Sequence, residues 1–353
     1  MSITAGQDIV AADFIYKSEG NATPANDAGR VPKLESNGKL HSIYLSGDFG
    51  DGSDGDVTIA APTTLTRDMY YNNLTVNSTV DTAGYRIFVK NKIDGSGTIR
   101  NNGAGGGNGG NGSGSTGGTA GAAPAVTSGY FVNTAGAAGV TGINAGNNAG
   151  GGTSAAAVAN SLVTTAAGNG GKGGRGDAGA PAAPNGGTGA TPTASRTKNG
   201  ILRWQSFAML DITSTGATII YKSGGGGGSG GVGGAQASSS SGGSGAGGAS
   251  GGIVFIAARE FAGTFTIEAK GGVGGNAGTC GGTNAGGSSG GGGGTGGYIF
   301  VIYNKKSWTG SSDVTGGTFG TKATNIGSGQ NDNTNGTAGG VGTYLEVDLT
   351  TLM

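Results

Sequence analysis

The sequence is poor in the residues that catalysis, disulfides and metal sites need. Its 353 residues include one Cys, Cys280, and one His, His41. A single Cys cannot form an intramolecular disulfide, and one His with one Cys cannot make a structural zinc site. A Ser–His–Asp or Cys–His arrangement would have to use His41, which is far in sequence from Cys280. We therefore expect no enzyme, no cofactor and no metal.

Charge, proline and long apolar runs are also scarce. Lys+Arg and Asp+Glu number 20 each, charged residues make up 11% of the chain, and there are 7 Pro. The absence of a basic excess argues against a nucleic-acid partner. No apolar run approaches the about 20 residues that span a membrane, and the first residues lack the basic and apolar regions of a signal peptide. The low Pro content argues against collagen.

Glycine, in contrast, supplies 85 residues and keeps a regular spacing. In residues 223–235 (SGGGGGSGGVGGA), the side chains of Ser229, Val232 and Ala235 are three residues apart. A polyproline-II-type helix turns once every three residues and satisfies none of its own backbone groups. Several such helices can pair with one another if no Cβ holds them apart. The spacing therefore predicts a lattice of packed polyglycine-II helices.

The same spacing recurs in six glycine-rich runs, around 103–114, 168–179, 224–235, 242–252, 271–282 and 286–297. The alternative is a set of disordered Gly/Ser linkers, because glycine loses the most backbone freedom on ordering. The recurring register, and the apolar segments between the runs, favour the lattice.

Short apolar segments predict an all-β body. Within 57–101, alternating segments are separated by turn residues every 8–12 residues, as in all-β proteins, which predicts strands at 57–59, 74–76, 86–89 and 97–99. We expect a β body of 46–101, completed by 200–222, 253–270 and 298–353, which is either a β-helix or a sandwich. Residues 201–210 are also compatible with a short helix, because periodicity alone does not decide.

The contents of the connecting segments predict two ends for the glycine-rich region, 102–297. If each run reverses direction, alternate connectors lie at opposite ends. The connectors 115–167, 236–241 and 283–285 then fall at one end, and they are polar or small. The connectors at the other end carry the strand-like segments. The region should therefore project from the β body and end in tip loops.

Three parts of the sequence resemble bacteriophage fibre proteins. Residues 29–40 (GRVPKLESNGKL) resemble N-terminal linkers of such fibres, and residues 64–103 resemble a β-rich module of glycine-rich phage and bacterial surface proteins. The run pattern over 103–297 resembles, in motif style, the glycine-rich tail-fibre adhesins of bacteriophages. In that family, polyglycine-II helices form a lattice whose distal loops contact the bacterial receptor.

This resemblance implies a virion fibre adhesin, extracellular, that binds an outer-membrane protein or polysaccharide. Residues 1–45 would attach it to other virion fibre proteins or to a second copy, and the oligomeric state stays open. Exposed aromatic and polar side chains in the tip loops are the expected receptor contacts, since aromatic rings suit sugars and protein surfaces. An equal alternative for Tyr130, Phe131 and Asn133 is that they anchor their loop to the lattice. The candidates are Tyr130, Phe131, Asn133, Gln236, Ser239 and Asn284.

Two other functions and one metal site are weaker alternatives. A self-assembling fibre or surface-layer subunit would pair through strand edges. A glycosidase would need two carboxyl groups, and Glu346 and Asp348 lie on one face of an expected strand. A turn at Asp48–Asp56 has carboxylates that suit Ca²⁺, although a solvated turn explains them too. The acids considered for catalysis are Asp211, Glu260, Glu268, Glu346 and Asp348.

Overall fold

A computed structural model describes most of the chain from Phe49 onward. The described residues are 49–127, 129, 131–145, 165–174, 185–191, 223–235, 238–325 and 333–351. The expected attachment segment 1–45 and the expected body segment 200–222 lie outside them, as do Tyr130 and Gln236.

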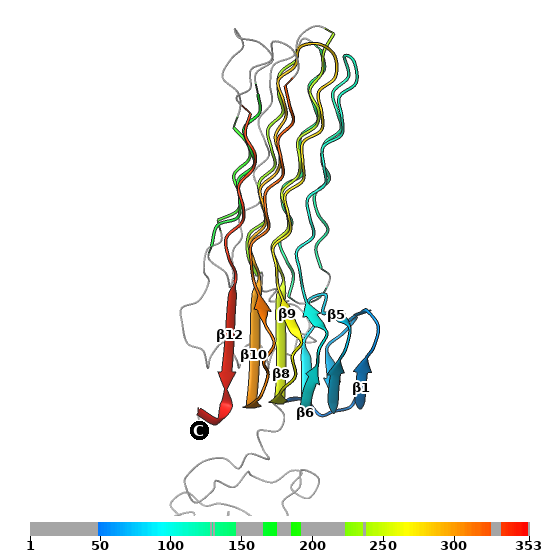
Figure 1. Cartoon of the computed structure of the whole chain (residues 1–353), viewed down its shortest axis with the longest axis vertical. Helices are drawn as coiled ribbons and strands as arrows, with labels where there is room; N and C mark the ends of the chain where they lie inside the picture. The colour runs from blue at the N-terminus through cyan, green and yellow to red at the C-terminus, as the bar shows by residue number, and fades with distance from the viewer. Residues whose placement is uncertain are drawn as a thin grey trace, which may run out of the picture.

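The described part is all-β, as the sequence predicts, and both of its sheets are entirely parallel (Figure 1). The larger sheet consists of β1 (Asp56–Ile59), β3 (Met69–Tyr71), β4 (Asn73–Val76), β6 (Ile87–Gly95), β8 (Ile253–Phe261), β10 (Tyr298–Lys306) and β12 (Thr343–Asp348). The smaller sheet consists of β2 (Thr63–Thr64), β5 (Thr79–Asp81), β7 (Thr98–Arg100), β9 (Thr266–Glu268) and β11 (Ser312–Asp313). A short 3-10 turn, Leu349–Thr351, follows β12.

The chain winds from one sheet to the other and back. Strands β4, β6, β8 and β10 belong to the larger sheet, and the strands that follow each of them belong to the smaller one. Ile253 pairs with Tyr298, and Tyr298 pairs with Thr343, which are two steps of 45 residues. In the smaller sheet, Ile267 pairs with Ser312 at the same step. The register thus repeats every 45 residues and divides 253–342 into two coils, the second of which is described over 298–325 and 333–342.

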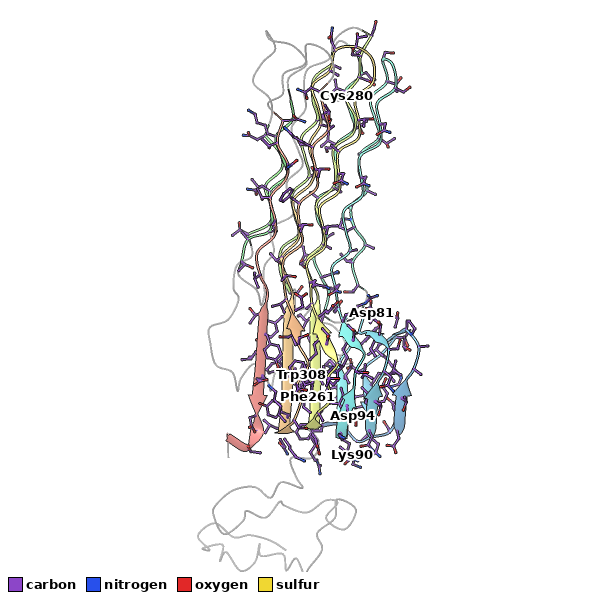
Figure 2. The ribbon with its side chains drawn as sticks, in the orientation of Figure 1. Asp81, Lys90, Asp94, Phe261, Cys280 and Trp308 are labelled. Carbon is purple, nitrogen blue, oxygen red and sulfur yellow. The ribbon has the colours of Figure 1, made fainter. Side chains whose placement is uncertain are left out.

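The main core lies between the two sheets. Alternate residues of each strand point inward, so branched aliphatic side chains from both sheets interlock. Val76, Ile93, Ile99, Ile256 and Ile267 are all fully buried there. Figure 2 shows Phe261 and Trp308 among the strands, at the end of the molecule that the two sheets occupy. The opposite face of the larger sheet carries a second cluster that includes Phe88, Phe255 and Phe300.

Glycine-rich segments extend from one end of the sheets, and several continue directly from a strand (Figure 1). Adjacent segments are joined by backbone hydrogen bonds at every third residue. The N–H groups of Gly103, Gly106 and Gly109 each donate to a carbonyl of the segment 270–279, over 2.8 Å. The described segments are 101–112, 117–122, 134–145, 165–174, 185–191, 223–235, 241–252, 269–280, 285–297, 314–325 and 333–342.

Close backbone contact explains why these segments are glycine-rich. A Cβ added to Gly247 would lie 1.8 Å from the carbonyl oxygen of Gly227, and one on Gly275 would lie 2.0 Å from that of Gly107. No side chain fits at such a distance. Some buried serine hydroxyls act as acceptors for the N–H groups of a neighbouring segment. The Ser244 hydroxyl accepts the Val140 N–H at 2.7 Å, and that of Ser250 accepts the Thr134 N–H at 2.8 Å.

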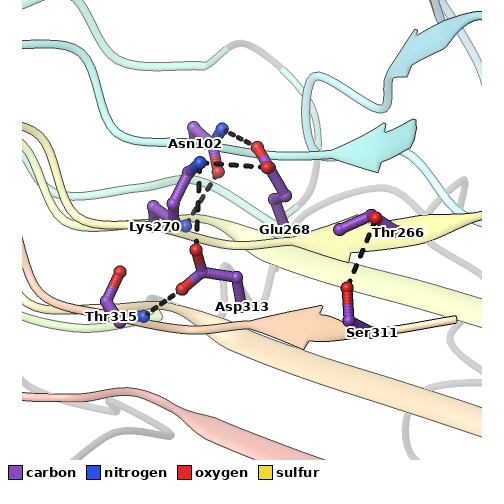
Figure 3. Close-up of polar contacts among 7 residues, drawn as sticks. All are labelled: Asn102, Thr266, Glu268, Lys270, Ser311, Asp313 and Thr315. Carbon is purple, nitrogen blue, oxygen red and sulfur yellow. Dashed lines mark hydrogen bonds and ion pairs between the residues drawn. The ribbon is translucent and has the colours of Figure 1, made fainter. Parts of the chain in front are cut away.

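Polar side chains join the coils where the strands pass into these segments (Figure 3). The Lys270 ammonium contacts the Glu268 carboxylate at 2.9 Å and the Asp313 carboxylate of the next coil at 3.9 Å. The Asn102 amide oxygen accepts the Lys270 N–H at 2.8 Å, and its nitrogen donates to Glu268 at 2.8 Å. Residues in or directly after β7, β9 and β11 therefore meet at this junction.

The predicted connector 115–167 is not a single tip loop. Its residues 117–122 return toward the sheets, where the N–H groups of Gly129 and Phe131 donate to the carbonyls of Ala83 and Gly84. Residues 134–145 then run outward again. Ala, Thr and Val occupy many positions of these two segments. Glycine content alone therefore did not reveal them.

Two further expectations about the path were wrong. The run that begins at 168 was expected to return to the body, but 165–174 runs parallel to 223–235, which leads away from the sheets. The region 298–353 was expected to belong to the body, yet it contains the segments 314–325 and 333–342 as well as β10, β11 and β12.

Candidate functional site at the distal turns

The described turns farthest from the sheets are 113–116, 238–240 and 280–285. Figure 2 places Cys280 at this end, opposite Lys90 and Asp94. We call these three stretches the distal turns. They are the described counterparts of the tip loops expected from the sequence.

The first distal turn, 113–116, is short and exposed. The N–H groups of Ser113 and Thr116 each donate to the other residue's carbonyl, both at 2.9 Å. Gly114 has φ of 54°, a left-handed conformation that glycine adopts without strain. All four residues are exposed. The turn therefore holds Ser113, Ser115 and Thr116 on a fixed backbone.

The second and third distal turns are locked to each other, and they bring Ser239 and Asn284 together. The Ser239 hydroxyl accepts the N–H groups of Thr283 at 3.1 Å and of Asn284 at 2.8 Å. Antiparallel bridges join Ser240 to Gly281 and Ala235 to Ala285. Ser239 is fully buried and Asn284 half-buried. Ser239 therefore positions the turns from within and presents no side chain to a partner.

A small apolar cluster lies beneath these turns. Ala235, Cys280 and Ala285 are buried, and Ile143 packs against them. The Cys280 thiol donates to the Gly286 carbonyl oxygen over 3.4 Å. Burial raises the pKa of this thiol, so it stays protonated near neutral pH and is a poor nucleophile.

Phe131 and Asn133 lie at the other end of the molecule. Phe131 is 1% exposed and packs on Phe255 of β8, with ring centroids 6.5 Å apart. Asn133 is buried, and its side-chain oxygen accepts the Thr127 N–H at 2.8 Å. Their expected position in a tip loop is wrong, because the chain returns to the sheets between 117–122 and 134–145. The anchoring alternative suits Phe131, with the sheet as its anchor point.

Sequence reasoning missed several exposed polar residues of the distal end. They are Ser113, Ser115, Thr116, Asn144, Ser238 and Thr283. The Asn144 side-chain oxygen accepts the Gly117 N–H at 2.8 Å, which fixes the side chain beside the first turn. The sequence signal was the Ser-Gly-Ser-Thr turn directly after a triplet run. None of the residues in the three distal turns is charged, so they are suited to a neutral, hydrogen-bonding ligand.

The acidic candidates are held in structural contacts. The Glu346 carboxylate accepts hydrogen bonds from the Lys306 ammonium at 2.5 Å and the Tyr344 hydroxyl at 2.8 Å. Burial alone would raise the pKa of Glu346, but these contacts hold it below its usual value. A glycosidase general acid needs the opposite shift. Asp348 accepts the N–H and hydroxyl of Thr350 at 2.9 and 2.7 Å.

The other two described acids also have partners. Glu260 contacts Lys305 at 3.2 Å, and Glu268 contacts Lys270 and Asn102. Asp211 lies outside the described residues.

The acidic turn near the start of the described chain uses its carboxylates internally. Asp54 contacts Arg67 at 2.6 Å and accepts the Tyr70 N–H at 2.7 Å. Asp56 accepts the side-chain amides of Asn72 and Asn73 at 2.7 and 2.9 Å. Among the described residues, no three acidic, His or Cys side chains are grouped to hold a metal. A structural turn explains these aspartates, while Asp48 lies outside the described part.

No protein-family model, no curated protein and no solved structure matches the chain. Within the ranges that the structure describes, no helix has the length and hydrophobicity that crossing a membrane requires.

Proposed function

We propose that this chain is a virion fibre adhesin that binds a bacterial surface receptor through its distal turns. The observation that carries the proposal is that uncharged polar side chains are held in fixed positions at the distal end of the hydrogen-bonded glycine-rich segments. We call these segments, whose ranges are given above, the stalk. The turns are held by reciprocal backbone bonds at 113–116 and by the buried Ser239 hydroxyl. A preorganised surface loses little conformational entropy when it binds.

We further propose that the body is a parallel β-helix and that the stalk is a lattice of polyglycine-II helices. Hydrogen bonds that recur at every third residue between neighbouring segments support the lattice, because this helix repeats every three residues. Segments 241–252 and 285–297 are buried throughout, as chains inside a lattice would be. At the rise of this helix, a 12-residue segment extends about 37 Å.

Side chains complete the hydrogen bonding where the proposed lattice meets solvent. The side-chain oxygens of Asn108 and Asn111 accept the N–H groups of Asn276 and Thr279, and that of Asn276 accepts the N–H of Thr321. These asparagines take the place of a neighbouring carbonyl. They stiffen the stalk that carries the turns.

The chemistry of the distal turns narrows the class of receptor. Hydroxyl and amide groups without charge suit the hydroxyl-rich surface of a polysaccharide or the polar loops of an outer-membrane protein. In this proposal the protein is extracellular, and residues 1–45 join it to the rest of the fibre or to a second copy. No cofactor is required for such binding.

The test is binding of the labelled protein to a panel of bacterial strains. The tip variant Ser115→Arg/Thr283→Arg changes two exposed turn positions. A matched variant, Ser307→Arg/Thr309→Arg, adds the same charge at exposed positions at the opposite end. Circular dichroism and thermal unfolding would establish that both variants fold as the unmodified protein does.

The proposal expects the unmodified protein and the Ser307→Arg/Thr309→Arg variant to bind the same strains, and the tip variant to lose that binding. Equal binding by all three proteins would move the contact away from the distal turns. Binding to no strain, together with fibres of the purified protein in electron micrographs, would favour the self-assembling alternative.

A further inference from the structure

The described residues of 253–297 and of 298–342 form equivalent coils, and the differences between the two coils indicate how the stack ends. We call the first the inner coil and the second the last coil. The strand register places Ile253 beside Tyr298, so each inner-coil residue corresponds to the residue 45 positions later. The last coil is followed by β12, which pairs with β10 at the edge of the larger sheet.

The inner coil packs against the last coil at glycine positions, where the two backbones lie in close contact. The N–H groups of Gly271 and Gly274 donate to the carbonyls of Thr315 and Thr318, at 2.9 and 2.8 Å. On the returning segment, a Cβ on Gly293 or Gly296 would lie 1.9 or 1.8 Å from a carbonyl oxygen of the last coil. One on Gly290 would lie 2.2 Å from the Gly320 carbonyl. Only glycine allows another coil to pack there.

The last coil carries side chains at these same positions. Gly290, Gly293 and Gly296 correspond to Asn335, Ala338 and Val341, and Gly274 and Ala277 correspond to Phe319 and Lys322. Phe319 is 42% exposed and Val341 56% exposed. Five positions that face the inner coil remain glycine, namely Gly317, Gly320, Gly336, Gly339 and Gly342. The replacements at Asn335, Ala338 and Val341 lie on the outward side. On the inward side, Gly278, whose Cβ would lie 1.9 Å from the Gly110 carbonyl oxygen, corresponds to Ala323.

Two hydrogen bonds of the last coil are made within that coil and not to a neighbouring one. The Ala277 N–H donates to the next coil at Thr321, whereas the equivalent Lys322 N–H donates to the Asn335 side chain of its own coil at 2.9 Å. The Lys322 ammonium donates to the Asn333 carbonyl at 3.0 Å. The bond from Gly336 N–H to Gly320 is 3.3 Å, against 2.9 Å for the inner-coil equivalent from Gly291 to Gly275. This lengthening occurs beside Phe319.

We infer that the last coil is a terminal cap, which closes this edge of the glycine-rich segments to a further coil or to a second copy of the chain. An incoming carbonyl would meet Cβ atoms where the packing distance requires hydrogen. Stacked repeats need such caps, because their open ends would otherwise pair with other chains. The inference concerns assembly and does not depend on receptor binding.

The test uses insertions into the full chain. The first variant carries a second copy of residues 253–297 after Gly297, so every coil interface keeps its glycines. The second variant carries a second copy of residues 298–342 after Gly342, which places a coil over Asn335, Ala338 and Val341. The third variant is the second with N335G, A338G, V341G and F319G in the first copy. Hydrogen exchange of the inserted glycine-rich segment is measured by mass spectrometry.

We expect the insert of the first variant to exchange at least about 100-fold more slowly than unstructured chain, since it packs on both sides. The insert of the second variant should exchange like unstructured chain, and the substitutions of the third variant should restore protection. Protection in the second variant equal to that in the first would overturn the cap. Lack of protection in the first variant would overturn the equivalence of the coils on which the inference rests.

Discussion

Substitution by alanine should affect stability differently at two adjacent glycines, Gly105 and Gly106. A Cβ added to Gly106 would lie 2.3 Å from the Ala246 carbonyl oxygen and 2.7 Å from that of Gly247. A Cβ added to Gly105 would meet only the Val273 Cγ2, at 3.1 Å, and no other atom closer than 3.6 Å. Neither residue has a positive φ, so the backbone conformation itself does not disfavour alanine at either position.

The magnitudes follow from these contacts. Overpacking of a close contact typically costs about 1–3 kcal/mol. Separating the segments also weakens nearby backbone bonds, such as the 2.8 Å bond from Gly106 to Val273, at about 0.5–1.5 kcal/mol each. Gly106→Ala should therefore lower the free energy of unfolding by about 2–4 kcal/mol. Gly105→Ala should leave it unchanged or raise it by about 0.4–1 kcal/mol, because alanine restricts the unfolded chain.

Urea unfolding followed by circular dichroism measures both variants against the unmodified protein. The difference between the two variants is the informative quantity, since it cancels the intrinsic preference of alanine over glycine. Equal effects of the two substitutions would refute close backbone packing in this segment.

Three further predictions concern polar contacts. Asp68→Ala should lower the free energy of unfolding in urea by about 3–5 kcal/mol, because it removes the carboxylate that pairs with the buried Arg86 guanidinium. Lys305→Ala, at an exposed ion pair, should lower it by at most about 1 kcal/mol, and similar losses for the two variants would contradict this. Asn276→Ala should speed amide exchange at Thr321, while Asn276→Asp, which keeps the acceptor oxygen, should not. Arg67 holds the pKa of Asp54 below its usual 3.8, so this contact stabilises the protein above about pH 4 and is lost as the pH falls further. Urea unfolding at pH 6 and pH 2 should therefore show the stability gap between the unmodified protein and Asp54→Asn shrinking at low pH, and a constant gap would contradict the assignment.

The strands and the spacing of the glycines could be read from the sequence because each has a local cause. Alternating apolar residues predicted Val57–Ile59, Leu74–Val76 and Gly97–Ile99, and these lie in or overlap β1, β4 and β7. Side chains three residues apart, with glycine between them, marked the most glycine-rich segments. The first pattern follows from the alternation of side chains along a strand, and the second matches the hydrogen bonds found at every third residue of the glycine-rich segments.

The path of the chain was harder to predict because it depends on contacts between distant residues. Segments 117–122 and 134–145 contain Ala, Thr and Val, and several of these residues, such as Thr119, Ala122 and Thr141, are exposed. The coils at 253–297 and 298–342 share mainly the glycines that face the preceding coil, such as Gly272 and Gly317. Their 45-residue repeat is therefore faint in the sequence and clear in the strand register.

The candidate site was predicted in part. Ser239 and Asn284, which the sequence analysis expected in tip loops, lie in the distal turns. Because the Ser239 side chain is buried, it holds the turns together and does not face a partner. Phe131 was placed at the wrong end because an aromatic side chain in a polar stretch suits exposure and anchoring equally well. Its contact with Phe255, more than a hundred residues later, decides the matter.

The most direct measurement for the account is hydrogen exchange of the unmodified protein over residues 241–252 and 285–297. Packed, hydrogen-bonded segments should be protected to nearly the same degree as β8 and β10, into which they run. Exchange at the rate of unstructured chain, with protection confined to the strands, would show that the glycine-rich segments are flexible linkers and would contradict the account.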